Sequence, residues 1–286
     1  MPNLKDFLTK ARQEKRAIGA FNAGNLEIAQ AVLQAAQAKQ ATVIIQTSAK
    51  EAAHFGMKNF LAVVNNFRAE SDLAIFTNLD HGPDLETCQK AIDLGYDMVH
   101  FDGSRLAYAE NLQLTQDLAK QAHGRGLLLE AEVDAILSSN ENSLINYTDP
   151  AKATDFVRRS GCDLLAVFVG NRHGVCPEGE PLDLNRLHQL TVQTECFLTL
   201  HGGSGIAPDQ IRQAINLGIV KINVNTELRL AYRETLENVL RGSDEVAIHQ
   251  LMPPVIAAVQ KVVEEKIDLF NNQSPTNNIP NLRPEI

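Results

Sequence analysis

Three histidines stand at or just after the ends of short apolar runs, where side chains from distant parts of a chain can converge. His81 and His201 each close such a run, and His173 follows a third. Three imidazoles that leave one coordination position open are a standard way to hold a catalytic zinc ion. One such histidine alone is more often a hydrogen-bonded side chain, but the set of three predicts a divalent metal site.

Acidic residues end three of the same kind of run. They are Asp80, Asp102 and Glu132. Near a metal, a carboxylate can be a further ligand, can orient a histidine ligand through a hydrogen bond, or can act as an acid/base group. The residue types leave these three roles open.

The apolar runs alternate with segments of helical periodicity, which is typical of βα units that build a parallel sheet. The eight predicted strands are Ala17–Asn22, Ala41–Ser48, Leu73–His81, Asp97–Ser104, Leu127–Asp134, Cys162–Gly170, Glu195–Gly203 and Ile219–Glu227. Glycines typical of left-handed helix caps stand at four predicted junctions, namely Gly95, Gly126, Gly161 and Gly218. An open doubly wound sheet usually has fewer strands, so we predict an α/β fold of the (β/α)8 TIM-barrel type.

The whole chain, residues 1–286, is predicted to form this single barrel domain. A further helical stretch from Asp244 to about Phe270 is expected as a C-terminal helical extension. Residues 271–286 are expected to form a flexible tail or to drape over a neighbouring subunit.

Reactive groups of such a barrel lie at the carboxyl ends of its strands. Besides the histidines and carboxylates above, the polar residues at predicted strand ends include Asn22, Ser48, Asn223, Asn225 and Thr226. We therefore expect these side chains to bind the substrate around the metal.

The segment HGGSG, residues 201–205, ends the seventh predicted strand just before a predicted helix. Backbone N–H groups there and the helix N-terminus are suited to bind a phosphate, which predicts binding by Gly202, Gly203 and Ser204. Arg229 lies one turn into the helix after strand eight, where it either reaches a second phosphate or is a solvated surface side chain.

Lys221 shares the inward face of the eighth predicted strand with Asn223 and Asn225, because side chains alternate with period two. An inward lysine can form a Schiff base with a ketone. We favour instead an ion pair low in the barrel with a carboxylate such as Asp102. His100 shares a face with Asp102 and either lines the site or is a hydrogen-bonded core histidine.

Charge and cysteine usage narrow the partners and the compartment. A formal net charge of −9 disfavours nucleic acid and anionic membrane surfaces, which need clustered Lys and Arg. No stretch approaches ~18 unbroken apolar residues, so no membrane segment is expected. The four cysteines form no CxxC pair, which favours the cytoplasm over a disulfide framework or thiolate zinc site. Cys176, three residues after His173, is accordingly disfavoured as a metal ligand.

Eight segments resemble motifs of the class II fructose-bisphosphate and tagatose-bisphosphate aldolase family, in the family's order and over nearly the whole chain. They are AFNAGNLE, LDHGPDLETCQKAIDLG, FDGSRLAYAEN, LEAEV, VGNRHG, EGEPLDLNRL, LTLHGGSGI and KINVNTELR. The resemblance implies a zinc-dependent lyase that cleaves a ketose 1,6-bisphosphate of the fructose or tagatose type into dihydroxyacetone phosphate and an aldehyde. It also implies a homodimer or homotetramer and a monovalent cation, Na⁺ or K⁺, near the first phosphate.

The resemblance further implies roles for individual residues. The catalytic zinc ligands would be His81, His173 and His201, and Asp80 would exchange a proton with the substrate C4 hydroxyl. An alternative or buried second divalent site would use Asp102 and Glu132. Arg229 would meet the distal phosphate. The residues around dihydroxyacetone phosphate would be Gly174, Gly202, Gly203, Ser204, Asn223, Asn225 and Thr226.

Two segments depart from the family pattern. The stretch EAEVDAILSSNENSLINYTDP is shorter than the family's mobile loop, lacks its Gly-Gly pair, and offers Glu141 as the acid that protonates the enediolate carbon. Glu178 stands where a lysine commonly precedes the GEP motif near the phosphate. The alternative functions are therefore an aldolase for a different ketose phosphate and a sugar-phosphate-binding barrel with weak turnover.

Overall fold

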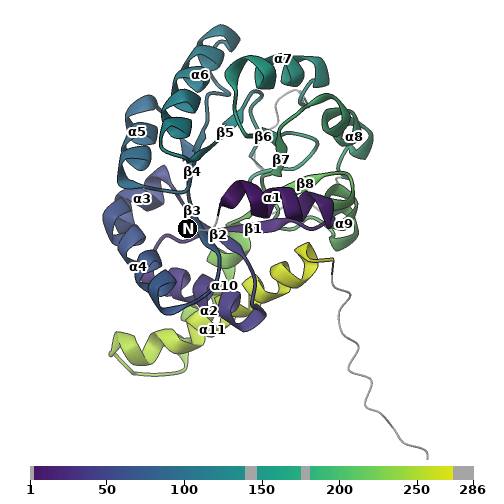
Figure 1. The fold of residues 1–286 in the computed structure, drawn as a ribbon. Coiled ribbons are helices and arrows are strands. Elements are labelled where there is room, and N and C mark those ends of the chain that lie inside the picture. Colours follow the sequence, from purple (N-terminus) through teal and green to yellow (C-terminus); the bar gives the residue numbers. More distant parts are fainter. Residues whose placement is uncertain (1–2, 139–146, 175–180, 273–286) are drawn as a thin grey trace, which may run out of the picture.

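The chain folds into a closed barrel of eight parallel strands, as the sequence predicted (Figure 1). The computed structural model describes residues 3–138, 147–174 and 181–272. The strands follow one another around the barrel in chain order, and β1 pairs with β8 to close it. Their bounds are β1 Ile18–Asn22, β2 Val43–Ser48, β3 Ile75–Gly82, β4 Met98–Phe101, β5 Leu128–Glu132, β6 Leu164–Val167, β7 Phe197–Leu200 and β8 Ile219–Val224. All lie within the predicted ranges except β3, which runs one residue further.

Helices surround the barrel and cover one of its ends (Figure 1). Their bounds are α1 Leu4–Gln13, α2 Leu26–Lys39, α3 Ala49–Phe55, α4 Met57–Glu70, α5 Leu85–Leu94, α6 Tyr108–Gly124, α7 Pro150–Ser160, α8 Leu184–Gln193, α9 Pro208–Asn216, α10 Thr226–Arg241 and α11 Ile248–Phe270. The expected C-terminal extension is α11, which begins at Ile248 rather than Asp244 and packs against α2 and α10. Within the described residues, no helix is both long and apolar enough to cross a membrane.

Apolar side chains fill the barrel at the amino-terminal ends of its strands. They come from Ile18, Ala20, Ile44, Phe76, Met98, Leu128, Leu164, Phe197 and Val220. Helix α1, which was not predicted, lies across this end of the barrel (Figure 1). Its apolar residues Leu4, Leu8 and Ala11 recur at helical spacing and are buried in the same layer. The amino-terminal end of the barrel is therefore closed by apolar packing.

Two residues further along the strands, the inward side chains become polar, because inward positions alternate with period two. On β1 to β5 they are Asn22, Gln46, Asn78, His100 and Glu130, which are all buried. Buried polar groups are costly unless they form hydrogen bonds. Gln46 meets this need on two sides, since it donates to Asn22 Oδ1 at 2.8 Å and accepts from Asn78 Nδ2 at 2.8 Å. The functional site is built on this polar layer.

Outside the barrel, one continuous apolar core joins the strands to the surrounding helices. Helices end at or near the four glycines that the sequence predicted as caps. Gly95 and Gly161 cap α5 and α7 in the left-handed region, and Gly126 and Gly218 also have positive φ values, of +73° and +117°. These turns return the chain from each helix into the next strand.

Asp84 begins α5, the helix that follows the strand carrying Asp80 and His81. Its side chain accepts a hydrogen bond of 2.7 Å from the backbone N–H of Thr87, and this bond lowers the pKa of the carboxyl. We expect Asp84→Ala to lower the free energy of unfolding by about 1 kcal/mol at pH 7. Because the folded pKa is lowered, this stabilisation is present above the aspartate pKa of the unfolded chain and is lost as the pH falls through the folded value.

Urea denaturation at pH 7 and at about pH 3 measures both effects. Asp84→Asn is the control, since it keeps a side-chain acceptor at the helix start. Equal stability of the Asp84→Ala variant and the parent at pH 7 would contradict the assignment of this cap.

Candidate active site and metal centre

A cavity of about 480 Å³ lies at the carboxyl-terminal ends of the strands, on the polar layer of the barrel. Its lining residues are Asn22, Ser48, Asp80, His81, Ser138, His173, Gly174, His201, Gly202, Ser204, Asn223, Asn225, Thr226 and Arg229. All of them except Ser138 were predicted as site residues. Gly203 was also predicted but does not line the cavity, because its backbone N–H donates to Asn223 O of β8 at 2.9 Å.

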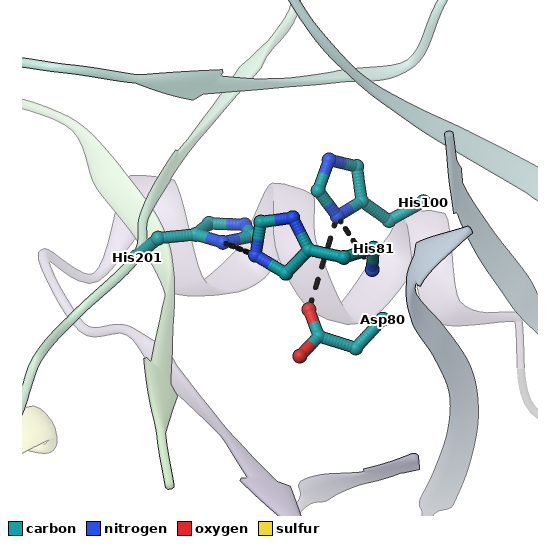
Figure 2. A group of neighbouring side chains, drawn as sticks. All are labelled: Asp80, His81, His100 and His201. Atoms are coloured by element: carbon teal, nitrogen blue, oxygen red, sulfur yellow. Dashed lines mark hydrogen bonds and ion pairs between the residues drawn. The ribbon is translucent and has the colours of Figure 1, made fainter. Parts of the chain in front are cut away.

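The three predicted histidine ligands gather at one wall of this cavity. The ring centroid of His81 lies 4.7 Å from that of His201 and 4.8 Å from that of His173. The rings of His173 and His201 are 5.8 Å apart. An irregularity in the β3–β4 pairing presents His81 with a φ of +47°, in the left-handed region. Figure 2 shows the rings of His81 and His201 meeting edge to edge through their nitrogens.

Hydrogen bonds to carboxylates decide which nitrogens of these rings remain available. His81 Nδ1 lies 2.9 Å from Asp102 Oδ2, and His201 Nε2 lies 2.7 Å from Glu130 Oε1. Each ring directs its other nitrogen at its neighbour, and His81 Nε2 lies 3.0 Å from His201 Nδ1. Two lone pairs repel one another at this distance unless a proton or a cation lies between them. The arrangement fits a divalent metal, whose histidine ligands are commonly oriented by carboxylates.

The pKa values agree with such a site. Burial lowers the pKa of His81, but the charge of Asp80 and the hydrogen bond to Asp102 outweigh it, so that this pKa is raised. Burial lowers the pKa of His201 to about 3 and that of His173 to about 4. Of the three rings, His81 is thus the one whose protonated form its neighbours favour. A divalent cation would compete with a proton for these nitrogens.

Asp80 lies next to this pair with both carboxylate oxygens held by amides. Asn22 Nδ2 donates to Oδ2 and Asn223 Nδ2 donates to Oδ1, each at 3.0 Å. Burial alone would raise the pKa of Asp80, but the charge of His81 and the interaction with His100 hold it well below its usual value. Asp80 is therefore ionised and can accept a proton from a ligand in the cavity.

Asp102 and Glu132, predicted as ligands of a second metal site, also come together with His81. One ligand atom of each of the three residues lies within 4.8 Å of the others. Burial and the charge of Asp102 raise the pKa of Glu132 to about 8. Burial opposes ionisation of Asp102 as well, but the hydrogen bond from His81 outweighs it and lowers that pKa. Asp102 and Glu132 together therefore carry one negative charge. Binding of a second cation would displace the proton of Glu132, so that both carboxyl groups would be ionised.

Lys221 forms the ion pair with a carboxylate low in the barrel that the sequence favoured, but its partner is Glu130 rather than Asp102. Its Nζ atom lies 2.8 Å from Glu130 Oε2, with no exposed surface on either side chain. The barrel register places Lys221 opposite Ile18, deep in the barrel, whereas Asp102 lies beyond the end of β4. A buried and paired ammonium has no access to a substrate carbonyl, which disfavours the Schiff-base alternative.

His100 is a buried, hydrogen-bonded histidine that does not line the cavity, as the sequence favoured, and it packs against the histidines of the centre. Its ring is fully buried and lies 4.6 Å from that of His81 and 4.9 Å from that of His201 (Figure 2). The backbone N–H of His81 donates to His100 Nδ1 at 3.1 Å. Nδ1 is therefore an acceptor, and Nε2 carries a proton and lies 3.8 Å from Glu132 Oε2. His100 holds the irregular backbone that presents His81.

Two glutamates of the site were missed. Glu130 is buried beneath the histidines, and its signal was the EAE segment, where period two places it on the inward face with Glu132. Glu51 accepts from Asn22 Nδ2 at 3.0 Å, from the Ser48 backbone N–H at 2.8 Å and from Asn225 Nδ2 at 3.2 Å. Its signal was the capping box Ser-Ala-Lys-Glu at the start of α3.

Some predicted residues lie outside the described part of the chain. They are Glu141, Cys176, Glu178 and residues 273–286 of the tail.

A region suited to anions lies in the same cavity, beside His201. Gly202 and Ser204 line it from the loop after β7, and Thr226 and Arg229 line it from the first turn of α10. Arg229 forms no ion pair with a residue that the structure describes. An unpaired guanidinium beside a helix N-terminus favours binding of a phosphate.

Gly202 allows this loop its close packing. Its φ is +62°, and a Cβ atom there would lie 1.9 Å from the carbonyl oxygen of Arg172. Gly126 is a matched control, because its φ is +73° but a Cβ atom would meet nothing within 4 Å. We expect Gly126→Ala to lower the free energy of unfolding by about 1–2 kcal/mol, which is the cost of a left-handed backbone conformation for a residue with a Cβ atom.

Gly202→Ala should lower the free energy of unfolding by more than Gly126→Ala does, because the loop after β7 must move away from Arg172. The same movement should abolish binding of inorganic phosphate. Urea denaturation and titration calorimetry measure the two effects. Equal losses of stability in the two variants, with phosphate binding intact, would contradict this role of Gly202.

The chain is similar to known proteins over almost its whole length. The family model described as "Fructose-bisphosphate aldolase class-II" matches residues 2–274. The fructose-bisphosphate aldolase of Streptococcus pyogenes serotype M1 is 38% identical, over 93% of this chain and 96% of that protein. That of Geobacillus stearothermophilus is 36% identical, over 85% and 87%. The crystal structure of the YdjI aldolase from Escherichia coli K12 matches with a TM-score of 0.83 at 30% identity, over 94% of this chain and 96% of that one.

Proposed function

Since this chain belongs to the class-II fructose-bisphosphate aldolase family, we propose that it is a zinc-dependent aldolase acting on a ketose 1,6-bisphosphate. Membership makes the protein a metal-dependent lyase that binds a sugar phosphate. Zinc as the metal and a fructose- or tagatose-type substrate are the finer assignments proposed here. One observation supports them most: His81 Nε2 and His201 Nδ1 face each other beside the ionised carboxylate of Asp80.

We assign the catalytic zinc to the three clustered histidines, His81, His173 and His201. A divalent cation held there supplies the electrophile that polarises a ketone and stabilises an enediolate. We assign a second divalent site to Asp102 and Glu132, and Na⁺ or K⁺ near the first phosphate. The donor set fits zinc, which prefers imidazole and carboxylate ligands.

Both anionic ends of the substrate are assigned to the region formed by the loop after β7 and the start of α10. We place the dihydroxyacetone phosphate half near the loop after β7 and the start of α10, and the distal phosphate at Arg229. The supporting geometry is the unpaired guanidinium and the backbone of residues 202–204. The remaining assigned binding residues are Asn22, Ser48, Gly174, Asn223, Asn225 and Thr226.

In the cleavage direction, Asp80 removes the proton of the substrate C4 hydroxyl as a general base. The C4–O electrons form the aldehyde carbonyl while the C3–C4 bond breaks, and its electron pair passes into the C2–C3 enediolate. Protonation at C3 then gives dihydroxyacetone phosphate. We propose Glu141 as the proton donor for this last step. Asn22 and Asn223 aim the carboxylate of Asp80 throughout, because they hold both of its oxygens.

The two departures from the family pattern bear on which ketose phosphate is cleaved. Glu178 adds negative charge where a lysine is usual, and the 133–150 segment is short. A panel of fructose, tagatose and other ketose phosphates distinguishes the proposal from a different ketose phosphate and from a binding barrel with weak turnover. We also propose a homodimer or homotetramer in the cytoplasm, on the basis of the family resemblance and of a sequence whose cysteines form no CxxC pair.

Removal of the metal tests the first part of the proposal. We expect EDTA to abolish cleavage and Zn²⁺ to restore it. Borohydride added with substrate should not attach substrate to Lys221, because that ammonium is buried and paired with Glu130. Metal analysis, cleavage assays and mass spectrometry on the same sample give the answer. Full activity without bound metal, or a reduced adduct on Lys221, would refute the metal mechanism.

Substitution of Asp80 tests the proton transfer. We expect Asp80→Ala to lower kcat by about 10²–10⁴-fold while zinc stays bound, because the general base is lost but the histidines remain. The matched control is Asp84→Ala, which removes a carboxylate four residues along that only caps α5. Parent-like turnover of the Asp80→Ala variant would show that another group takes the proton.

A further inference from the structure

A buried ion pair lies directly beneath the candidate metal centre. Lys221 Nζ and Glu130 Oε2 are 2.8 Å apart, and neither side chain has any exposed surface. Neither residue lines the cavity, so neither can touch a substrate there. Burying two charges is costly even when they are paired, and an apolar pair of similar volume is often as stable. Stability alone therefore does not account for the pair.

We propose that Lys221 is a positioning residue that sets the direction of the hydrogen bonds on both sides of the site. Through Glu130 it fixes the tautomer of His201, and directly it fixes the orientation of the Asn223 amide. The inference rests on the proposed function, because it takes His201 as a metal ligand.

The direction follows from the chemistry of an ammonium, which can only donate. Lys221 Nζ forms the ion pair with Glu130 Oε2 at 2.8 Å and donates a hydrogen bond to Asn223 Oδ1 at 2.7 Å. A fully buried ammonium needs an anion as its partner, and Glu130 is the side chain at ion-pair distance from it. Glu130 therefore stays a carboxylate, and its second oxygen can only accept.

On the metal side, that second oxygen lies 2.7 Å from His201 Nε2. An accepting carboxylate requires the ring proton to lie on Nε2. His201 Nδ1 then carries a lone pair, and this is the atom that faces His81 Nε2 at 3.0 Å. Lys221 thus keeps the metal-facing Nδ1 atom of His201 unprotonated. It acts on this ring through Glu130, which lies between them.

On the side of Asp80, Lys221 donates a hydrogen bond to the oxygen of the Asn223 amide. The amide nitrogen must therefore point away from Lys221, and it donates to Asp80 Oδ1 at 3.0 Å. A reversed amide would direct its oxygen at the carboxylate of Asp80, where two acceptors repel. One ammonium thus orients both the metal ligand and the group that holds the general base.

Glu130→Gln tests the inference without changing the size of the side chain. With Lys221 present, the Gln carbonyl must face the ammonium and its NH₂ group must face His201 Nε2. The proton of His201 then moves to Nδ1, which removes the lone pair for the metal. We expect zinc affinity, measured by competition with a chromogenic chelator, to fall about 10–100-fold.

Lys221→Met added to Glu130→Gln is the decisive variant. Without the ammonium, the Gln can turn its carbonyl toward His201, so that the proton returns to Nε2. We therefore expect the double variant to regain most of the zinc affinity that Glu130→Gln lost. A purely structural role predicts the opposite, because a second buried substitution would only weaken the site further.

The position of the His201 ring proton is read independently from ¹⁵N shifts of histidine-labelled, metal-free protein. The inference expects Nε2–H in the parent and the double variant and Nδ1–H in Glu130→Gln. Parent-like zinc affinity or an Nε2–H ring in Glu130→Gln would overturn it, as would a double variant weaker than Glu130→Gln. Absence of zinc binding by the parent would instead refute the proposed function, and the ring protons would still decide the inference.

Discussion

The ion pair of Lys221 with Glu130 is the interaction on which the polar half of the barrel interior depends. Side chains at this level have no contact with bulk water, so each hydrogen bond needs a defined donor and a defined acceptor. The pair supplies a group that only donates and a group that only accepts. Loss of one partner would leave an unpaired buried charge, which costs about 3–5 kcal/mol in comparable cases.

Inward side chains alternate along each strand, and this alternation places the functional groups in layers above the apolar packing. Ala20, Ile44 and Phe76 form part of an apolar layer, and the residues two positions later form the polar layer above it. Two positions later again, Ser48 and Asp80 reach the cavity. Each functional side chain therefore stands on a packed neighbour of the same strand. Groups supported in this way keep their geometry better than groups on loops.

Much of the fold and of the cavity lining could be predicted, because both depend on local patterns. Apolar runs located the strands, and the rule that strand ends carry the chemistry located Asp80, His81 and His201. The partner of Lys221 could not be predicted, because it depends on how strands far apart in the chain are aligned. In the β1–β8 register Lys221 lies opposite Ile18, and in the β4–β5 register Glu130 lies opposite His100. A shift along either strand would have changed the pair.

Other differences have similar physical causes. The left-handed backbone of His81 arises from an irregular pairing of β3 with β4, which no local residue pattern marks. Gly203 turned away from the cavity because the loop after β7 bonds to β8 at that residue. Helix α1 was overlooked because its short apolar face gains its stability from the barrel end that it covers.

Closure of the amino-terminal end by α1 has a consequence for how the centre is supplied with its metal. The apolar layer blocks passage along the barrel axis from that side. Metal ions and solvent protons therefore reach the histidines by the same opening that admits the substrate. A molecule bound in the cavity would therefore lie across the route by which an ion enters or leaves the centre.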